Sequence, residues 1–290
     1  MKKYYLLPLF LLFLTISFSQ KKKNTNDGLK SSDLSGLKFR SVGPAFMSGR
    51  IADIAINPEN ENEWYVAVGS GGVWKTVNSG TTWKAITDDQ DFYSTGCITI
   101  DPHNSSKIWL GTGENVGGRH VGIGHGVFVS DNGGKSWKSM GLKSSEHISK
   151  IIVSPKDPNI VFVASQGPLW SSGGERGLYR TDNGGKTWKN VLSVNEWTGV
   201  TDIAIDHNNP NILYAATWQR HRNVASYMGG GPGTSIYKST DHGITWTEIK
   251  NGLPSSNLGK IGLAISPFDS SILYAAVETD RRNGAVYKTT

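Results

Sequence analysis

Cysteine is nearly absent from this chain. Its 290 residues contain one, Cys97, so no disulfide can form within the chain. Stability must therefore come from burial of apolar side chains, for which ten Trp, ten Tyr and nine Phe are available. Cys97 lies in the apolar run CITI, which predicts a buried, unreactive thiol.

The sequence also lacks a strong charge of one sign and the usual catalytic motifs. A formal charge of +6, from 30 basic and 24 acidic residues, is small and scattered, which argues against nucleic acid as a partner. No GxSxG or HExxH motif is present, and His120 and His125 have no tight cluster of further ligands around them. We therefore expect neither a metal nor another cofactor.

The only long hydrophobic run stands at the N-terminus. Lys2 and Lys3 precede YYLLPLFLLFLTISF, and small residues follow at Ser17 and Ser19. Residues 1–19 are thus predicted to be a secretory signal peptide, with a transmembrane anchor as the alternative. We expect a secreted mature protein, periplasmic or extracellular, without a membrane span. Residues 20–36 read as a polar, disordered linker.

A repeat of about fifty residues organises the rest of the chain. Five short apolar segments end in a hydroxyl residue, and the first four continue into a turn and a tryptophan, as in RTDNGGKTW at 180–188. Their hydroxyl residues are Thr76, Ser130, Thr181, Ser239 and Thr289. This period lies in the range of propeller blades.

Each repeat contains four short strand signals and no helical period of useful length. The fold class predicted is an all-β propeller with four-stranded blades over residues 37–290, in preference to a β-sandwich. About four and a half blades are present, so we expect an incomplete ring, truncated in the fifth blade. Residues 36–44 are a candidate for the strand that closes such a ring.

The turn RTDNGGKTW has features of two ligand-binding loops. A phosphate loop would need a glycine where Arg180 stands, and a calcium loop would need more acids than Asp182 and Asn183 supply. A structural turn remains. Its asparagine accepts hydrogen bonds from the turn's own backbone, its second glycine takes a positive φ, and its tryptophan packs between blades.

At these residues the sequence resembles the Asp-box, or BNR repeat, of sialidases, xyloglucanase-type glycoside hydrolases and the Vps10 domain of sortilin. Three of the four copies have Asn where the motif has Asp. Longer phrases, such as WYVAVGSGGVWKT and QGPLWSSGGERGLYRTDNGGKTW, resemble bacterial secreted proteins of the sortilin N-terminal-domain type. The resemblance covers about residues 37–290 and implies the fold more strongly than the function.

Candidate ligand-binding residues lie in the loops between the second and third strands, at the end of the blades opposite the Asp-box turns. These loops combine aromatic residues with arginines, which suits a carbohydrate or a peptide. The alternative is that the loops only cover the channel. The candidates in these loops are Arg119, His120, Trp170, Arg176, Trp218, Arg220 and Tyr227, and Arg50, at the mouth of the first inner strand, is expected to join them.

Two functions are weighed. The favoured one is a non-catalytic peptide- or glycan-binding module of the sortilin N-terminal type, and the alternative is a carbohydrate-active hydrolase. The xyloglucanase-type resemblance implies a catalytic acid in a first-blade stretch that reads VGSGGVW here, with Gly69 at the acid's place. That departure weighs against an enzyme. If the protein is a glycosidase, the candidate carboxylates are Glu114, Glu175 and Asp280.

Overall fold

The computed structural model describes residues 30–37, 49–119, 121–279 and 284–289, in two units, Met1–Met47 and Ser48–Thr290. The described part of the first unit contains a 3₁₀ turn, η1 (Ser31–Leu34), inside the proposed linker. The proposed signal peptide and residues 38–44 of the proposed closing strand lie outside the described residues, so both stay predictions. No helix in the described residues is long and apolar enough to cross a membrane.

The second unit is built almost entirely from antiparallel sheets. The first sheet contains β1 (Ile51–Ile56), β2 (Trp64–Val68), β3 (Gly72–Thr76) and β4 (Lys84–Ala85). The second contains β5 (Thr95–Asp101), β6 (Asn104–Thr112), β7 (Val127–Ser130) and β8 (Lys138–Ser139). The third contains β9 (Ile148–Val153), β10 (Val161–Ser165), β11 (Gly177–Thr181) and β12 (Lys189–Leu192), and a 3₁₀ turn, η2 (Lys143–Ser145), precedes it.

The remaining sheets follow in chain order. The fourth contains β13 (Thr198–Ile205), β14 (Leu213–Gln219), β17 (Ile236–Ser239) and β18 (Thr247–Ile249). A small hairpin, β15 (His221–Arg222) and β16 (Tyr227–Met228), is inserted between β14 and β17. Within the described residues the fifth sheet has three strands, β19 (Ile261–Ile265), β20 (Leu273–Val277) and β21 (Ala285–Lys288).

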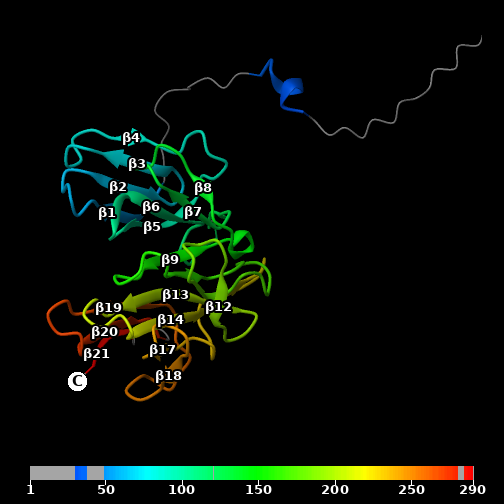
Figure 1. Ribbon diagram of the computed structural model, residues 1–290. Coiled ribbons are helices and arrows are strands. Elements are labelled where there is room, and N and C mark those ends of the chain that lie inside the picture. Colours follow the sequence, from blue (N-terminus) through cyan, green and yellow to red (C-terminus); the bar gives the residue numbers. More distant parts are fainter. Residues whose placement is uncertain (1–29, 38–48, 120, 280–283, 290) are drawn as a thin grey trace, which may run out of the picture. The chain divides into compact units, whose positions relative to one another are not determined.

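These sheets confirm the fold class predicted from the repeat. Four consecutive four-stranded sheets, each paired in sequence order, are the blades of an incomplete β-propeller (Figure 1). The first strands of successive blades, β1, β5, β9, β13 and β19, contact one another and form the inner wall. The turns that resemble the Asp-box, at residues 76–83, 130–137, 181–188 and 239–246, are called Asp-box turns below. Because the strands are antiparallel, these turns lie at one end of each blade and the loops between second and third strands lie at the other.

Side chain-to-backbone hydrogen bonds connect inner strands of neighbouring blades. The Asp53 carboxylate on β1 accepts a hydrogen bond from the Ile98 amide on β5 at 3.0 Å. Asp202 on β13 does the same for the Leu263 amide on β19 at 2.8 Å. Both aspartates stand at register shifts within their blades, at which the ladder to the second strand is interrupted. The shared position of these two acids in their repeats thus has a structural purpose.

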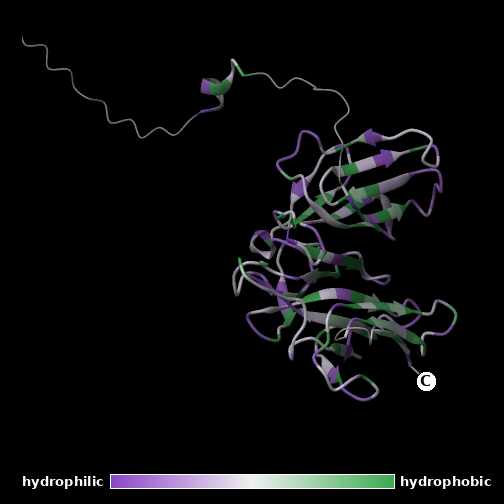
Figure 2. Cartoon of the chain, turned by 180° about the vertical axis from the view of Figure 1, so that it is seen from behind, coloured by the Kyte–Doolittle hydropathy of each residue, from purple (hydrophilic) through white to green (hydrophobic). Residues whose placement is uncertain are grey.

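The hydrophobic core is a series of layers between blades. One cluster joins the first two blades around Tyr65 and Ile108, the next joins the second and third around Trp109 and Ile151, and a third surrounds Phe162. Figure 2 shows the hydrophobic stretches that recur along the strands. Cys97 belongs to the second layer and is 1% exposed, so the predicted buried thiol is confirmed. Burial also raises the pKa of this thiol.

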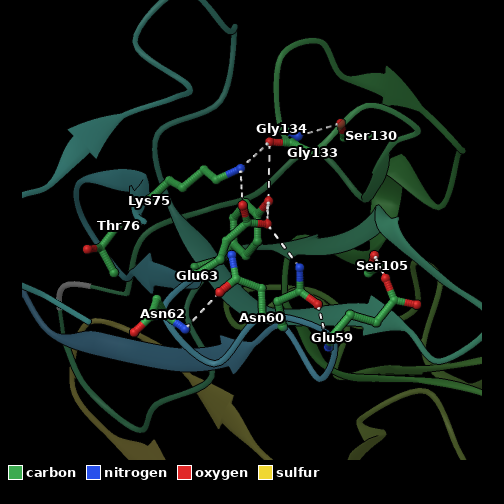
Figure 3. Close-up of polar contacts among 12 residues, drawn as sticks. Glu59, Asn60, Asn62, Glu63, Lys75, Thr76, Ser105, Ser130, Gly133 and Gly134 are labelled. Atoms are coloured by element: carbon green, nitrogen blue, oxygen red, sulfur yellow. Dashed lines mark hydrogen bonds and ion pairs between the residues drawn. The ribbon is translucent and has the colours of Figure 1, made fainter. Parts of the chain in front are cut away.

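The contact between the first two blades shows how neighbouring blades bind through the Asp-box turn (Figure 3). The Tyr65 hydroxyl donates to Glu63 at 2.8 Å, and the Lys75 ammonium pairs with the same carboxylate at 3.0 Å. Both groups also donate to the Gly133 carbonyl in the turn of the second blade, at 3.3 and 3.4 Å. The turn is therefore part of the interface between blades.

The turn chemistry predicted from RTDNGGKTW is confirmed. The Asn183 side chain accepts the Thr187 amide at 3.0 Å, and the Thr181 hydroxyl accepts the Gly185 amide at 3.0 Å. Gly185 has a φ of +86°, and a Cβ there would meet the Trp109 ring of the preceding blade at 3.0 Å. Equivalent hydrogen bonds form at Asn78, Asn132 and Asp241.

The predicted packing of the repeat's tryptophan between blades holds for three copies and not for the first. Trp188 donates to the Met140 carbonyl at 2.7 Å and lies edge-on to Trp109, and Trp137 and Trp246 also pack against clusters between blades. Trp83 is instead 40% exposed and contacts Trp64 of its own blade. The reason is that no described blade covers this face of the first sheet.

Replacing Asn183 by alanine is expected to lower the free energy of unfolding by about 1 kcal/mol, because the turn loses its acceptor for the Thr187 amide. Thermal unfolding measures the change as a fall in Tm of about 2–4 °C for a domain of this size. Asn183→Asp keeps the acceptor, and Asp241 already occupies the equivalent position in the fourth blade. Equal losses in both variants would refute the assigned turn chemistry.

Candidate functional site

The loops opposite the Asp-box turns bring together residues from several blades. The loop after β6, residues 113–126, reaches the third, fourth and fifth blades. The Asn115 side chain accepts a hydrogen bond from the Gln166 side chain of the third blade. The backbone carbonyl of Asn115 accepts another from the Lys260 ammonium at 2.7 Å. Arg220 of the fourth blade donates to the Val116 carbonyl at 3.1 Å. Loops of four blades thus contact one another here, and covering of the channel by these loops stays a prediction.

Three of the predicted ligand-binding side chains are buried in this contact. Arg220, Trp218 and Arg176 are 0%, 2% and 4% exposed. The Arg220 guanidinium lies 5.2 Å from the Trp218 ring centre, and the Lys260 ammonium lies 5.4 Å from it. Arg176 donates to the carbonyls of Gln166 and Ser171, each at 2.7 Å. These side chains have clear structural contacts, and ligand binding by them stays a prediction.

Four other predicted residues are accessible. The Arg50 side chain is 51% exposed, Trp170 is 52% exposed and Tyr227 is 37% exposed, and Arg119 is also on the surface. Tyr227 belongs to the β15–β16 hairpin, where the Arg222 guanidinium lies 4.5 Å from its ring centre. Sequence reasoning missed this hairpin because its strands have two residues each. His120 and Asp280 lie outside the described residues.

Arg50 and Glu114 form an ion pair between the first and second blades. Arg50 immediately precedes β1, whereas Glu114 comes two residues after β6. The Glu114 carboxylate also accepts the Gly122 amide at 2.6 Å, which folds its loop back on itself. The Glu114 side chain is only 3% exposed, so the part of the pair that solvent reaches is mainly the Arg50 side chain.

Gly69, which stands where the xyloglucanase-type resemblance implies a catalytic acid, lies directly beside this pair. A Cβ placed at Gly69 would collide with the Glu114 carboxylate. The next blade thus supplies a carboxylate at the place into which a side chain at position 69 would project. Sequence reasoning identified Glu114 and Gly69 separately and did not connect them, because 45 residues separate the two positions in the chain.

The other candidate carboxylate has a different environment. Glu175, in the loop between β10 and β11, accepts the Ser144 amide at 2.7 Å and so fixes the turn before the third blade. No group of three or more His, Cys, Asp or Glu that could bind a metal occurs in the described part of the chain. Of the two described candidate carboxylates, Glu114 is thus the one that forms an ion pair, with Arg50.

Comparison with known proteins gives two kinds of relative. A family model described as Sortilin, neurotensin receptor 3, matches residues 125–253. A xyloglucanase of Hypocrea jecorina is 28% identical over 76% of this chain, and xyloglucanase Xgh74A of Acetivibrio thermocellus is 24% identical over 76%. The chain spans 28% of the length of each of these two relatives.

Solved structures agree on the fold. An ancestral GH74 enzyme has a TM-score of 0.62 at 19% identity and matches 82% of this chain and 30% of its own. The GH74 xyloglucanase of Xanthomonas campestris has a TM-score of 0.59 at 16% identity, over 81% of this chain and 36% of its own. These structures agree with the propeller fold. The curated relatives favour the carbohydrate-active alternative over the sortilin-type binding module and do not support the inclination against an enzyme.

Proposed function

We propose that this chain is part of a carbohydrate-active hydrolase that acts on β-glucans of the xyloglucan type. The observation that carries the proposal is the similarity to two xyloglucanases over about three quarters of the chain. The Arg50–Glu114 pair supports it, because its carboxylate lies where the resemblance expects an acid from position 69.

The role assigned to the pair is recognition of sugar hydroxyl groups. The Arg50 guanidinium donates hydrogen bonds, the Glu114 carboxylate accepts them, and hydrogen bonds to charged groups are stronger than those between neutral groups. Exposed aromatic rings on the same end of the blades, Trp170 and Tyr227, provide apolar faces for pyranose rings.

Hydrolysis requires a second carboxylate about 5–9 Å from the first. The partners of Glu114 are a guanidinium and a backbone amide, which serve binding and orientation. We therefore assign to this chain a polysaccharide-binding surface with one candidate acid, Glu114. This assignment keeps Glu114 of the three carboxylates predicted from the sequence. It sets Glu175 aside because that side chain accepts the Ser144 amide.

The match of residues 125–253 to the sortilin description favours a second candidate, a peptide-binding module. The exposed Trp170 and Arg119 suit peptide side chains as well as sugars. One experiment with both ligand classes therefore decides between the two functions.

Calorimetric titration with xyloglucan oligosaccharides tests the proposal. Glu114→Gln is expected to lower affinity about tenfold or more, since a charge-assisted hydrogen bond is lost. Glu59→Gln is the matched control, because Glu59 is exposed in the turn between β1 and β2, at the opposite end of the blades, where it accepts a hydrogen bond from the Ser105 hydroxyl. Assays for released reducing ends, run in parallel, report hydrolysis. Binding of peptides but not xyloglucan, or equal affinities in the two variants, would reject the proposal.

A further inference from the structure

The buried contact around the loop after β6 contains more positive charge than its direct partners balance. Arg220 and Lys260 donate to the carbonyls of residues 116 and 115, and Arg176, from a third blade, donates to the carbonyl of Gln166, whose side chain contacts Asn115. None of the three has a carboxylate ion-pair partner in the part of the chain that the structure describes. Their hydrogen-bond acceptors are backbone carbonyls. Arg220 and Lys260 lie over the Trp218 ring, and Arg176 lies over the Trp197 ring.

Several polar atoms in the same contact have no hydrogen-bond partner. They belong to side chains that are at most 4% exposed. Arg220 leaves Nε and Nη2 unpaired, and Arg176 leaves Nε unpaired. His147 Nδ1 and Gln166 Oε1 are unpaired as well. Buried polar groups without partners are costly, and such a group in a native protein calls for an unobserved water or ion.

These unpaired groups are close to one another. Arg176 donates to the Gln166 carbonyl, and the Gln166 amide donates to the His147 carbonyl at 2.9 Å. Arg220 holds Val116, the residue next to Asn115, which the Gln166 side chain contacts. These six residues of the second, third and fourth blades are thus linked in one contact beneath the loops.

The pKa values of Arg220 and Lys260 show that burial disfavours their positive charge. The pKa of Arg220 is lowered to about 9, mainly by burial; Tyr227 and Glu146 act to raise it and the charge of Arg176 acts to lower it. Burial, followed by the charge of Arg220, lowers the pKa of Lys260 to about 8. Buried charges need compensation, and here the groups without partners are mostly N–H donors on cations.

We propose that the Arg176–Arg220 cluster binds one small inorganic anion of the halide class. The unpaired Nε–H groups of both guanidinium groups and the Nη2 group of Arg220 are its donors. These donors belong to side chains buried beneath the loop after β6, and a monatomic anion such as chloride is the smallest ligand that accepts hydrogen bonds from all of them. This inference does not depend on the proposed carbohydrate function.

The anion has a structural consequence for the loop after β6. It neutralises the arginine that holds Val116, two residues from Glu114. The loop that carries Glu114 is therefore expected to be better ordered when the anion is bound. Halide would then stabilise the fold and also the position of the Arg50–Glu114 pair.

Thermal unfolding in sodium bromide tests the site. Sodium gluconate replaces bromide at constant ionic strength, because gluconate is too large to enter the buried cluster. Wild-type protein should show a saturable rise in Tm of about 5–10 °C at a hundredfold excess over Kd. Arg220→Gln should abolish the rise, and Arg180→Gln should retain it, since Arg180 pairs with Asp182 elsewhere. A bromide response equal to that of gluconate would overturn the proposal.

Crystals grown in bromide provide a second measurement that does not depend on the folding of a variant. An anomalous peak within hydrogen-bond distance of Arg220 Nε is the expected result. Density that contains only water at this position would overturn the proposal, because water alone would then satisfy the unpaired groups.

Discussion

Replacement of Trp109 by alanine is expected to lower the free energy of unfolding by about 3–5 kcal/mol. Trp109 is fully buried on β6, packs in the layer between the second and third blades, and contacts Trp188 edge-on with ring centres 6.4 Å apart. Its ring also lies against the Asp-box turn of the third blade at Gly185. The substitution therefore opens a cavity in an interface between blades.

Chemical denaturation of wild type and variant measures this loss. Trp170→Ala is the matched control, because Trp170 is 52% exposed and truncating it removes little packing. Its effect is expected to stay within about 0.5 kcal/mol. Similar losses at the two positions would mean that the layer between blades does not stabilise the fold as described.

Gly96→Ala is expected to be about as disruptive, with a loss of about 3 kcal/mol. Gly96 lies on the inner strand β5, and a Cβ there would overlap the carbonyl oxygens of Ile148 and Gly113. Both oxygens belong to the backbone, so no rotamer change relieves the collision. The second and third blades would have to separate at the inner wall.

Gly262→Ala is the control for the same chemical change. Gly262 lies on β19, also an inner strand, and a Cβ there has only Asp202 within reach, at 3.9 Å. Its replacement is expected to change the free energy of unfolding by at most about 0.5 kcal/mol. Circular dichroism during thermal unfolding compares the two variants, and a loss at Gly262 as large as that at Gly96 would contradict the described contact of β5 with β9.

The repeated part of the fold could be predicted because local chemistry determines it. Asn183 and Gly185 act within nine residues of sequence, and the hydroxyl of Thr181 completes the same turn. Such turns mark where the third strand ends and the fourth begins. Four copies of one pattern then fix the blade length, which is why fold class was accessible from the sequence.

The site was less predictable because its contacts join distant residues. Arg50 and Glu114 are 64 residues apart, and Lys260 contacts a carbonyl 145 residues away. Burial was also hidden in the sequence. Arg220 and Trp218 read as rim residues of a loop rich in aromatic and basic residues, yet they are almost completely buried beneath the loop after β6.

A crystal structure of the protein with a xyloglucan oligosaccharide tests the central claim most directly. The account predicts sugar hydroxyl groups within hydrogen-bond distance of Arg50 and Glu114, beside Gly69, with the chain extending toward the exposed Trp170. Oligosaccharide bound at the Asp-box end of the blades, or absent from the loops at saturating concentration, would contradict it.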